Sequence, residues 1–333
     1  MMRDEERRSS AETMCCASCS CGTQKLDDIE LNGSMADIVA VARMMCCASC
    51  GKSELDDVKL MACDDCKSVR YCSDACQQDH REQHEVKCKE YQAAELRDEV
   101  LFRQPESAHL GDCPICCLPL PIEEEKRSLY LCCSKLICNG CFFADNDVHK
   151  CPFCRQSLPK TDEEGEKNLM KRAEANDPVA IREMGVINDF RDEYDKAFGC
   201  YKRAAELGDV EAHYNLSILY ENGQGVEKDE KKDVYHLEEA AVAGHPMARH
   251  YLGCHEEKNY RFERAVKHWI IAANLGLDES INALKQCYKH GYVSKEDFAK
   301  TLRAHHSAVN AMKSSQREEA EKFFPANGSE GMR

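Results

Sequence analysis

Cysteine is distributed very unevenly along this 333-residue chain. Of the 24 cysteines, 21 lie in residues 1–154, and only Cys200, Cys254 and Cys287 follow. A segment so rich in cysteine buries too little apolar surface to fold alone, so it must cross-link itself or hold metal. The chain begins MMRDEERRSS, without the apolar stretch of a secretory signal, which predicts an intracellular location, cytoplasmic or nuclear. Thiolates in that reducing environment bind zinc rather than form disulfides, so we expect residues 1–154 to depend on zinc.

The charge and the apolar runs of the chain each exclude one class of partner. Residues 1–160 hold 28 Asp and Glu against 20 Lys and Arg, and residues 161–333 hold 32 against 25. Neither part has the basic surplus that phosphate contacts need, so nucleic acid is not an expected partner. No apolar run approaches the roughly 20 residues that cross a bilayer, so no membrane partner is expected.

Residues 47–88 contain eight soft ligands in four close pairs, enough for two tetrahedral zinc sites. A CxxC pair suits a tight turn whose two sulfurs converge on one ion. From Cys76 onward, His80, His84 and Cys88 follow at intervals of four, which predicts that they share one face of a helix. The pairs are Cys47 and Cys50, Cys63 and Cys66, Cys72 and Cys76, and His84 and Cys88.

This series of pairs, with the tripeptide Arg70-Tyr71-Cys72, resembles the MYND-type zinc finger. The resemblance implies interleaved sites and places His80 where the family often has Trp, so we expect His80 to pack rather than bind metal. One zinc would take Cys47, Cys50, Cys72 and Cys76, and the other Cys63, Cys66, His84 and Cys88. An earlier partial copy, Cys15 to Cys21, lacks partner pairs and is interpreted as a disordered relic of duplication.

Residues 113–154 contain a second series, CPIC…CC…CNGC…CPFCR, which resembles a RING finger. Lys135 occupies the usual histidine position, and a protonated lysine is a poor ligand. Cys132 can take its place beside Cys133, and His149 remains the competing candidate. The resemblance implies cross-braced sites and about four Zn²⁺ ions per chain, two per finger. One site would hold Cys113, Cys116, Cys138 and Cys141, and the other Cys132, Cys133, Cys151 and Cys154.

The RING resemblance also implies an activity. RING fingers act as ubiquitin ligases by docking a ubiquitin-charged E2 enzyme, and their closed zinc sites do no chemistry. Three residues match E2-contact positions of that family: Ile115, Pro152 and Arg155. The alternative is a purely structural zinc module in a scaffold without ligase activity.

The second half of the chain repeats. The segments AAELGD (204–209), AAVAGH (240–245) and AANLGL (272–277) recur at steps of 36 and 32 residues, a spacing typical of stacked supersecondary units. The pattern is similar to Sel1-like repeats, with units at about 178–209, 210–245 and 246–277 and a degenerate fourth from 278 to about 310. Stacked helical pairs offer a concave surface for another protein. The dispersed histidines of this half are expected to be packing or surface residues.

The expected fold class is therefore mainly α, with two small cross-braced zinc fingers followed by an α/α solenoid of helical hairpins. We interpret the chain as a zinc-binding protein-interaction adaptor in which the solenoid selects a client, the second finger recruits an E2, and the first finger holds a second peptide, often proline-rich in that family. The expected segments are 1–44 (disordered), 45–88 (first finger), 89–112 (linker helix), 113–158 (second finger), 159–177 (charged linker helix), 178–310 (repeats) and 311–333 (a tail, frayed helix then disorder).

Overall fold

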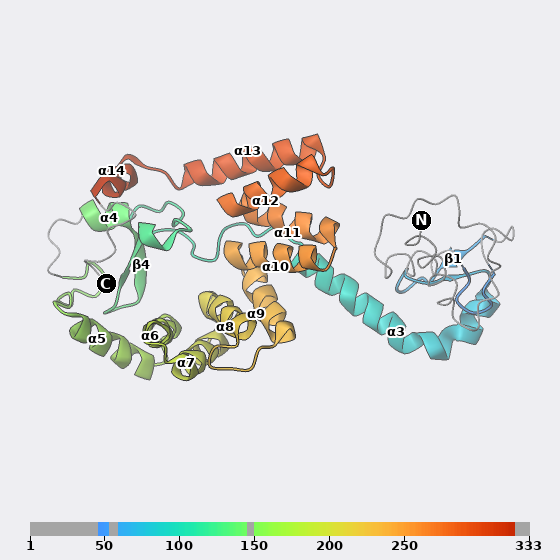
Figure 1. Ribbon diagram of the computed structural model, residues 1–333, viewed down its shortest axis with the longest axis horizontal. Helices are drawn as coiled ribbons and strands as arrows, with labels where there is room; N and C mark the ends of the chain where they lie inside the picture. Colours follow the sequence, from blue (N-terminus) through green and yellow to red (C-terminus); the bar gives the residue numbers. More distant parts are fainter. Residues whose placement is uncertain (1–45, 53–58, 145–149, 324–333) are drawn as a thin grey trace, which may run out of the picture. The chain divides into compact units, whose positions relative to one another are not determined.

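A computed structural model describes residues 46–52, 59–144 and 150–323 of the chain. The chain divides into two compact units, whose boundary lies between Val100 and Leu101. The fold is mainly helical, as the sequence predicts, with a cysteine-rich N-terminal part that is followed along the chain by a helical solenoid (Figure 1). The partial copy at Cys15 to Cys21 and the candidate ligand His149 lie outside the described residues. Within the described ranges, no helix has both the length and the apolar character needed to cross a bilayer.

The first unit is a small finger built on a two-stranded sheet and a long helix. Strand β1 (Met61–Ala62) pairs antiparallel with β2 (Arg70–Tyr71), and α3 (Asp74–Leu101) follows. We expected a separate linker helix within 89–112, but α3 runs unbroken from the finger to Leu101. Residues 89–101 are rich in good helix formers, and the first helix-breaking residue after them is Pro105. The core of this unit consists of Cys47, Leu60, Cys63, Cys66, Tyr71 and Cys88.

The second finger opens the second unit. A 3₁₀ turn, η2 (Glu124–Lys126), leads into β3 (Arg127–Tyr130), which pairs antiparallel with β4 (Lys135–Cys138), and the helix α4 (Asn139–Ala144) follows. The hairpin register sets Arg127 opposite Cys138 and Tyr130 opposite Lys135. The finger's core consists of Cys113, Leu120, Tyr130, Cys132, Ile137, Cys138, Cys141 and Cys151.

The solenoid consists of helical pairs that follow the predicted repeats. Aspartates cap several of these helices, and Asp177, for example, accepts hydrogen bonds from the amides of Val179 and Ala180. Fully buried small residues such as Ala240 and Ala241 let neighbouring helices approach closely. The helices are α5 (Asp162–Glu174), α6 (Pro178–Phe190), α7 (Tyr194–Glu206), α8 (Val210–Asn222), α9 (Glu230–Val242), α10 (Pro246–Lys258), α11 (Phe262–Asn274), α12 (Asp278–Lys289) and α13 (Lys295–Ala311).

The solenoid's inner side is not free, contrary to the sequence-based expectation. Helices α5 to α13 follow an arc, and β3, β4 and α4 lie within it (Figure 1). Arg172 on α5 donates to the hydroxyl of Ser134 (3.0 Å), and Arg127 on β3 lies 3.6 Å from the carboxylate of Glu211 on α8. The second finger and the solenoid therefore form one packed unit.

The C-terminal segment also differs from the prediction of a frayed tail. Ser315–Phe323 forms a further helix, α14, which packs on α4 of the second finger. Arg317 and Ala320 of this helix are buried. The helix is ordered because its apolar and cationic side chains find partners on the finger, which lies far away in sequence.

Candidate metal centres and solenoid pocket

Four of the CxxC turns, all but the one that begins at Cys138, share one backbone geometry. In each, the residue after the second cysteine has a positive φ, between +53° and +74°, and its amide donates to the carbonyl of the first cysteine at 2.8–3.0 Å. This turn brings both sulfurs of a pair to the same side of the chain. Three of the four residues are not glycine, so the surrounding fold holds them in the left-handed region. The four residues are Gly51, Lys67, Cys117 and Arg155.

In the first finger, the structure brings together the same two groups of four ligands that the MYND resemblance implies. In one group, the sulfur of Cys72 lies 3.5 Å from those of Cys50 and Cys76. In the other, Cys66 Sγ lies 3.4 Å from His84 Nε2, and the sulfurs of Cys63 and Cys88 are 4.0 Å apart. Thiolates at about 2.3 Å from a tetrahedral zinc lie about 3.8 Å from each other, so both groups fit zinc.

His80 lies outside these converging groups. Its Nδ1 is 3.1 Å from the hydroxyl of the buried Tyr71, and its ring stacks at 5.8 Å on that of His84. His80 thus supports the ring of a ligand rather than joining the ligand set.

In the second finger, the structure brings together two groups of four cysteines in cross-braced order. The sulfurs of Cys116 and Cys138 are 3.8 Å apart. Cys132 and Cys133 both belong to the other group, with Cys154 Sγ 3.4 Å from the first and Cys151 Sγ 3.6 Å from the second. Within each group, all four sulfurs lie within 4.8 Å of one another. The adjacent pair Cys132 and Cys133 therefore supplies the ligand that Lys135, at the usual histidine position, does not supply.

The electrostatics of these groups also fit a divalent cation. Burial raises the pKa of the Cys132 and Cys141 thiols, and their neighbouring sulfurs raise it further. Burial likewise raises the pKa of Cys88 to about 12. At Cys47, burial acts in the same direction, but backbone hydrogen bonds from Cys50, Cys72 and Ser49 outweigh it and lower the pKa to about 6. Four crowded sulfurs ionise together only when a cation offsets their charge, and Zn²⁺ supplies it.

The three residues that the RING resemblance matches to E2 contacts lie on the surface of the second finger. Ile115 is 45% exposed, and Pro152 and Arg155 are exposed as well. An apolar side chain this exposed between two ligand cysteines is available for a partner.

A further cluster joins the second finger to the solenoid, and the sequence analysis missed it. The carboxylate of Glu211 on α8 accepts from the Nε2 atoms of His109 (2.9 Å) and His245 (3.1 Å), whose rings stack at 4.4 Å. These residues are up to 136 positions apart and form no local motif, so no sequence signal connects them. Burial opposes ionisation of Glu211, but the two imidazoles outweigh it and hold the pKa of the carboxyl well below its usual range.

The His109–Glu211–His245 cluster does not fit a metal ion. His245 Nδ1 accepts a hydrogen bond from the amide of Ala248 (3.2 Å), so the proton of the neutral ring is on Nε2. That nitrogen points at Glu211 and has no free lone pair for a metal. The guanidinium of Arg127, 3.6 Å from the same carboxylate, would also repel a metal cation bound there. The cluster is a hydrogen-bonded ion-pair network.

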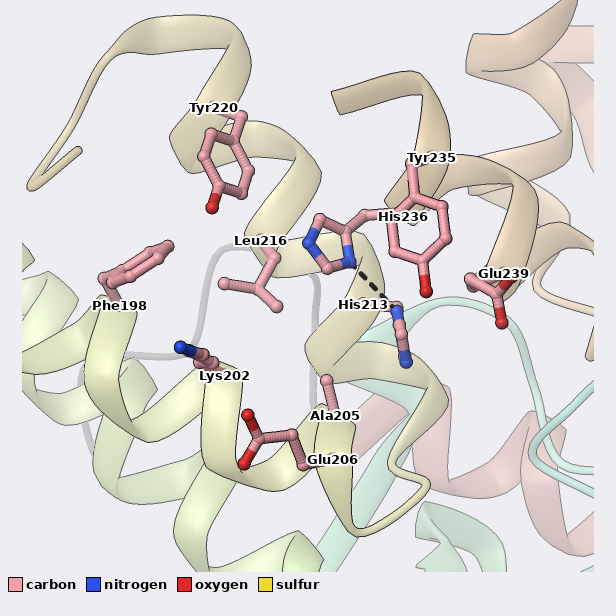
Figure 2. Close-up of a pocket in the computed structure, with 10 residues that line it drawn as sticks. All are labelled: Phe198, Lys202, Ala205, Glu206, His213, Leu216, Tyr220, Tyr235, His236 and Glu239. Carbon is pink, nitrogen blue, oxygen red and sulfur yellow. Dashed lines mark hydrogen bonds between the residues drawn. The ribbon is translucent and has the colours of Figure 1, made fainter. Parts of the chain in front are cut away.

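A pocket of about 320 Å³ lies between α7, α8 and α9 (Figure 2). His213 and Glu211 are two residues apart on α8, which sets their side chains on opposite sides of that helix. The imidazoles of His213 and His236 meet at 3.0 Å, and burial lowers the pKa of His236 to about 4, so one neutral ring donates to the other. The pocket is lined by Phe198, Lys202, Ala205, Glu206, His213, Leu216, Tyr220, Tyr235, His236 and Glu239.

Comparison with known families agrees with this organisation. Residues 47–88 match the family model of the MYND finger, and residues 183–209, 210–245 and 248–277 match the Sel1 repeat. Both are protein-interaction modules, so the chain is a zinc-binding protein of the adaptor class, with several Zn²⁺ sites. These matches confirm the predicted MYND-type finger and the predicted Sel1-like repeats.

Two solved structures are similar to part of the chain. A Sel1 repeat protein from Oxalobacter formigenes is 29% identical over 46% of this chain and 66% of that protein, with a TM-score of 0.41. A protective antigen of uropathogenic Escherichia coli strains with an SLR fold is 22% identical over 50% of this chain and 37% of the antigen, with a TM-score of 0.36. The chain thus spans less than two thirds of either protein. The curated proteins gave no match.

Proposed function

We propose that this chain is a zinc-dependent adaptor that brings a client protein to a ubiquitin-charged E2 enzyme, and so acts as a RING-type ubiquitin ligase. The observation that supports this most is the exposure of Ile115, Pro152 and Arg155 together on the surface of the second finger. The contacts with α5, α8 and α14 involve other residues and leave these three accessible. The cross-braced order of the two cysteine groups is the second support.

In this proposal the chain contributes no catalytic residue. The zinc sites hold the finger's loops, Ile115 and Pro152 contact the E2, and Arg155 contacts the E2 and its ubiquitin. Ubiquitin moves to the client because both are held close together, which raises their effective concentration. Because the finger packs against the solenoid in a fixed position, a bound E2 is held at a fixed distance from the client.

Autoubiquitination with purified E1 and a panel of E2 enzymes tests the proposal. The full chain should form product with at least one E2, and Ile115→Ala should lower the rate about tenfold, since it truncates an anchor at the centre of the contact. Val242→Ala is a matched control, because Val242 on α9 is also a branched aliphatic residue and is 45% exposed, like Ile115. No product with any E2, from a chain with its full zinc content, would instead support the alternative of a non-catalytic scaffold.

We propose that the client binds at the pocket between α7, α8 and α9. The inner side of the solenoid packs on the second finger, whereas this pocket is open and has exposed aromatic surface at Tyr235. Tyr235→Ala should reduce ubiquitin transfer to a co-purified client and leave autoubiquitination unchanged. Equal loss of both reactions, or of neither, would contradict this assignment. The first finger is proposed to bind a proline-rich peptide, and titration of such peptides onto the full chain tests that.

A further inference from the structure

The second finger receives a side chain from the far end of the chain. Arg317 on α14 is 6% exposed, and its guanidinium lies against the turn that follows Cys116. One terminal nitrogen donates to the carbonyl of Pro119 at 2.7 Å. The other donates to the carbonyl of Leu118 at 3.3 Å and lies 3.4 Å from Cys116 Sγ. The guanidinium thus bridges the backbone of the turn and a candidate zinc ligand.

The finger is shaped to accept this helix. Gly140, one residue before Cys141, has no side chain, and a Cβ there would lie 2.9 Å from both the amide nitrogen and Cγ of Arg317. Any larger residue would push α14 away from α4. Ala320 of α14 is 1% exposed in the same contact. The rings of Phe143 and Phe323 meet at 4.9 Å, and Lys126 lies 3.4 Å from the carboxylate of Glu321.

The charge of the site explains why a cation is buried there. Four thiolates and one Zn²⁺ carry a net charge of about −2, and three of the four cysteines of this group are at most 5% exposed. A buried negative site of this kind is stabilised by hydrogen bonds to its sulfurs, and cationic donors give the strongest ones. Arg317 is the cation that the fold delivers to this position.

We propose that Arg317 is an outer-sphere hydrogen-bond donor to the zinc site of Cys113, Cys116, Cys138 and Cys141, and that α14 is therefore a structural part of the second finger. The inference rests on the zinc assignment of the proposed function, and it goes further by making metal retention at one site depend on the C-terminal helix. Loss or displacement of α14 would then loosen this zinc while the other sites keep theirs.

Zinc release from the full chain tests this proposal. The wild-type protein, Arg317→Met, Arg317→Lys and the control Arg303→Met are mixed with a chelator, and a metallochromic indicator follows each zinc equivalent. Arg303 is exposed on α13, so its substitution should change nothing. Arg317→Met should weaken the binding of one equivalent about 10–100-fold, as is typical for loss of an outer-sphere partner, and Arg317→Lys should restore part of it.

Cadmium NMR of the same proteins separates a hydrogen bond to sulfur from a general loss of packing. Arg317→Met should shift one cadmium resonance and leave the others in place. Gly140→Ala displaces α14 without touching a ligand and should loosen the same equivalent, whereas Gly199→Ala, with nothing within 4 Å of its Cβ, should not. Unchanged release rates and resonances in Arg317→Met would overturn the inference. Two or fewer zinc ions in the wild-type chain would instead remove the zinc assignment of one finger, and if the cadmium resonances of the second finger were the missing ones, the failure would lie in the zinc assignment and not in the role of Arg317.

Discussion

Substitution of Glu211 by alanine tests whether the second finger and the solenoid form one stable unit. The Glu211 carboxylate is the shared acceptor for His109 and His245 and lies 3.6 Å from Arg127, whose side chain is only 8% exposed. Glu211→Ala removes this acceptor and leaves a buried guanidinium and two imidazole N–H groups without it. Breaking a buried ion pair on one side costs about 3–5 kcal/mol, because the remaining charge stays desolvated, and the exposed carboxylate of Glu124, 3.7 Å from Arg127, offsets only part of that cost.

Thermal unfolding followed by circular dichroism gives the magnitude. For a unit of this size, about 1 kcal/mol corresponds to roughly 2–4 °C in Tm, so Glu211→Ala should lower Tm by roughly 6–20 °C. Glu211→Gln should have an intermediate effect, since its amide oxygen still accepts one hydrogen bond. The matched control is Glu206→Ala, an exposed glutamate in the last turn of α7 that should change stability by less than about 0.5 kcal/mol.

Limited proteolysis localises the effect. Loss of the network should expose the segment around His109, whose backbone amide also donates to the carbonyl of Gly244 at 3.1 Å. Cleavage there should therefore become faster in Glu211→Ala. If Glu211→Ala were as stable as Glu206→Ala and equally resistant to protease, the network would not hold the finger on the solenoid.

Three further predictions follow from the same structure. Chelation of zinc from the full chain should expose the finger cysteines to thiol labelling and lower the Tm of the repeats, because the second finger packs on the solenoid and depends on zinc; an unchanged Tm would contradict the single packed unit. Burial and, after it, the positive charges of Arg249 and Arg264 lower the pKa of His268 to about 3. Protonation of this histidine therefore favours the unfolded state as pH falls below about 6.5. This histidine alone should cost the solenoid about 2 kcal/mol of stability by pH 5, and His268→Gln should reduce the dependence of stability on pH by that amount in denaturant titrations. Gly253→Ala should cost about 1–3 kcal/mol, because its Cβ would lie 2.4 Å from Trp269 Nε1, and Gly199→Ala, with open space, serves as its control in the same titration.

The repeats were readable from the sequence because their signals are local. Small residues at a fixed spacing, such as Ala240 and Ala241, define where helices approach, and capping residues such as Asp209 define where they begin. The same holds for the ligand pairs, since a CxxC turn places two sulfurs together within four residues. The MYND spacing also predicted which pairs of the first finger meet, because the family pattern carries the interleaved order.

Two other parts of the prediction were wrong, one for a local reason and one because of a contact with a distant segment. The linker expected to begin a new helix at 89 instead continues α3, because nothing between His84 and Leu101 interrupts helix formation. The C-terminal segment expected to fray is instead ordered on the second finger, because Gly140 leaves space for Arg317. The sequence around Gly140 does not indicate a contact with Arg317, and the sequence around Arg317 does not indicate a contact with Gly140.

The sequence by itself determined that thiolate clusters and helical hairpins build this protein, since metal-ligand spacing and repeat period are properties of short segments. Only the tertiary structure decided that the second finger fills the inner side of the solenoid and that Glu211, His109 and His245 meet. Such contacts join residues more than 30 positions apart, and they form because burying a charge requires a partner, wherever along the chain that partner lies.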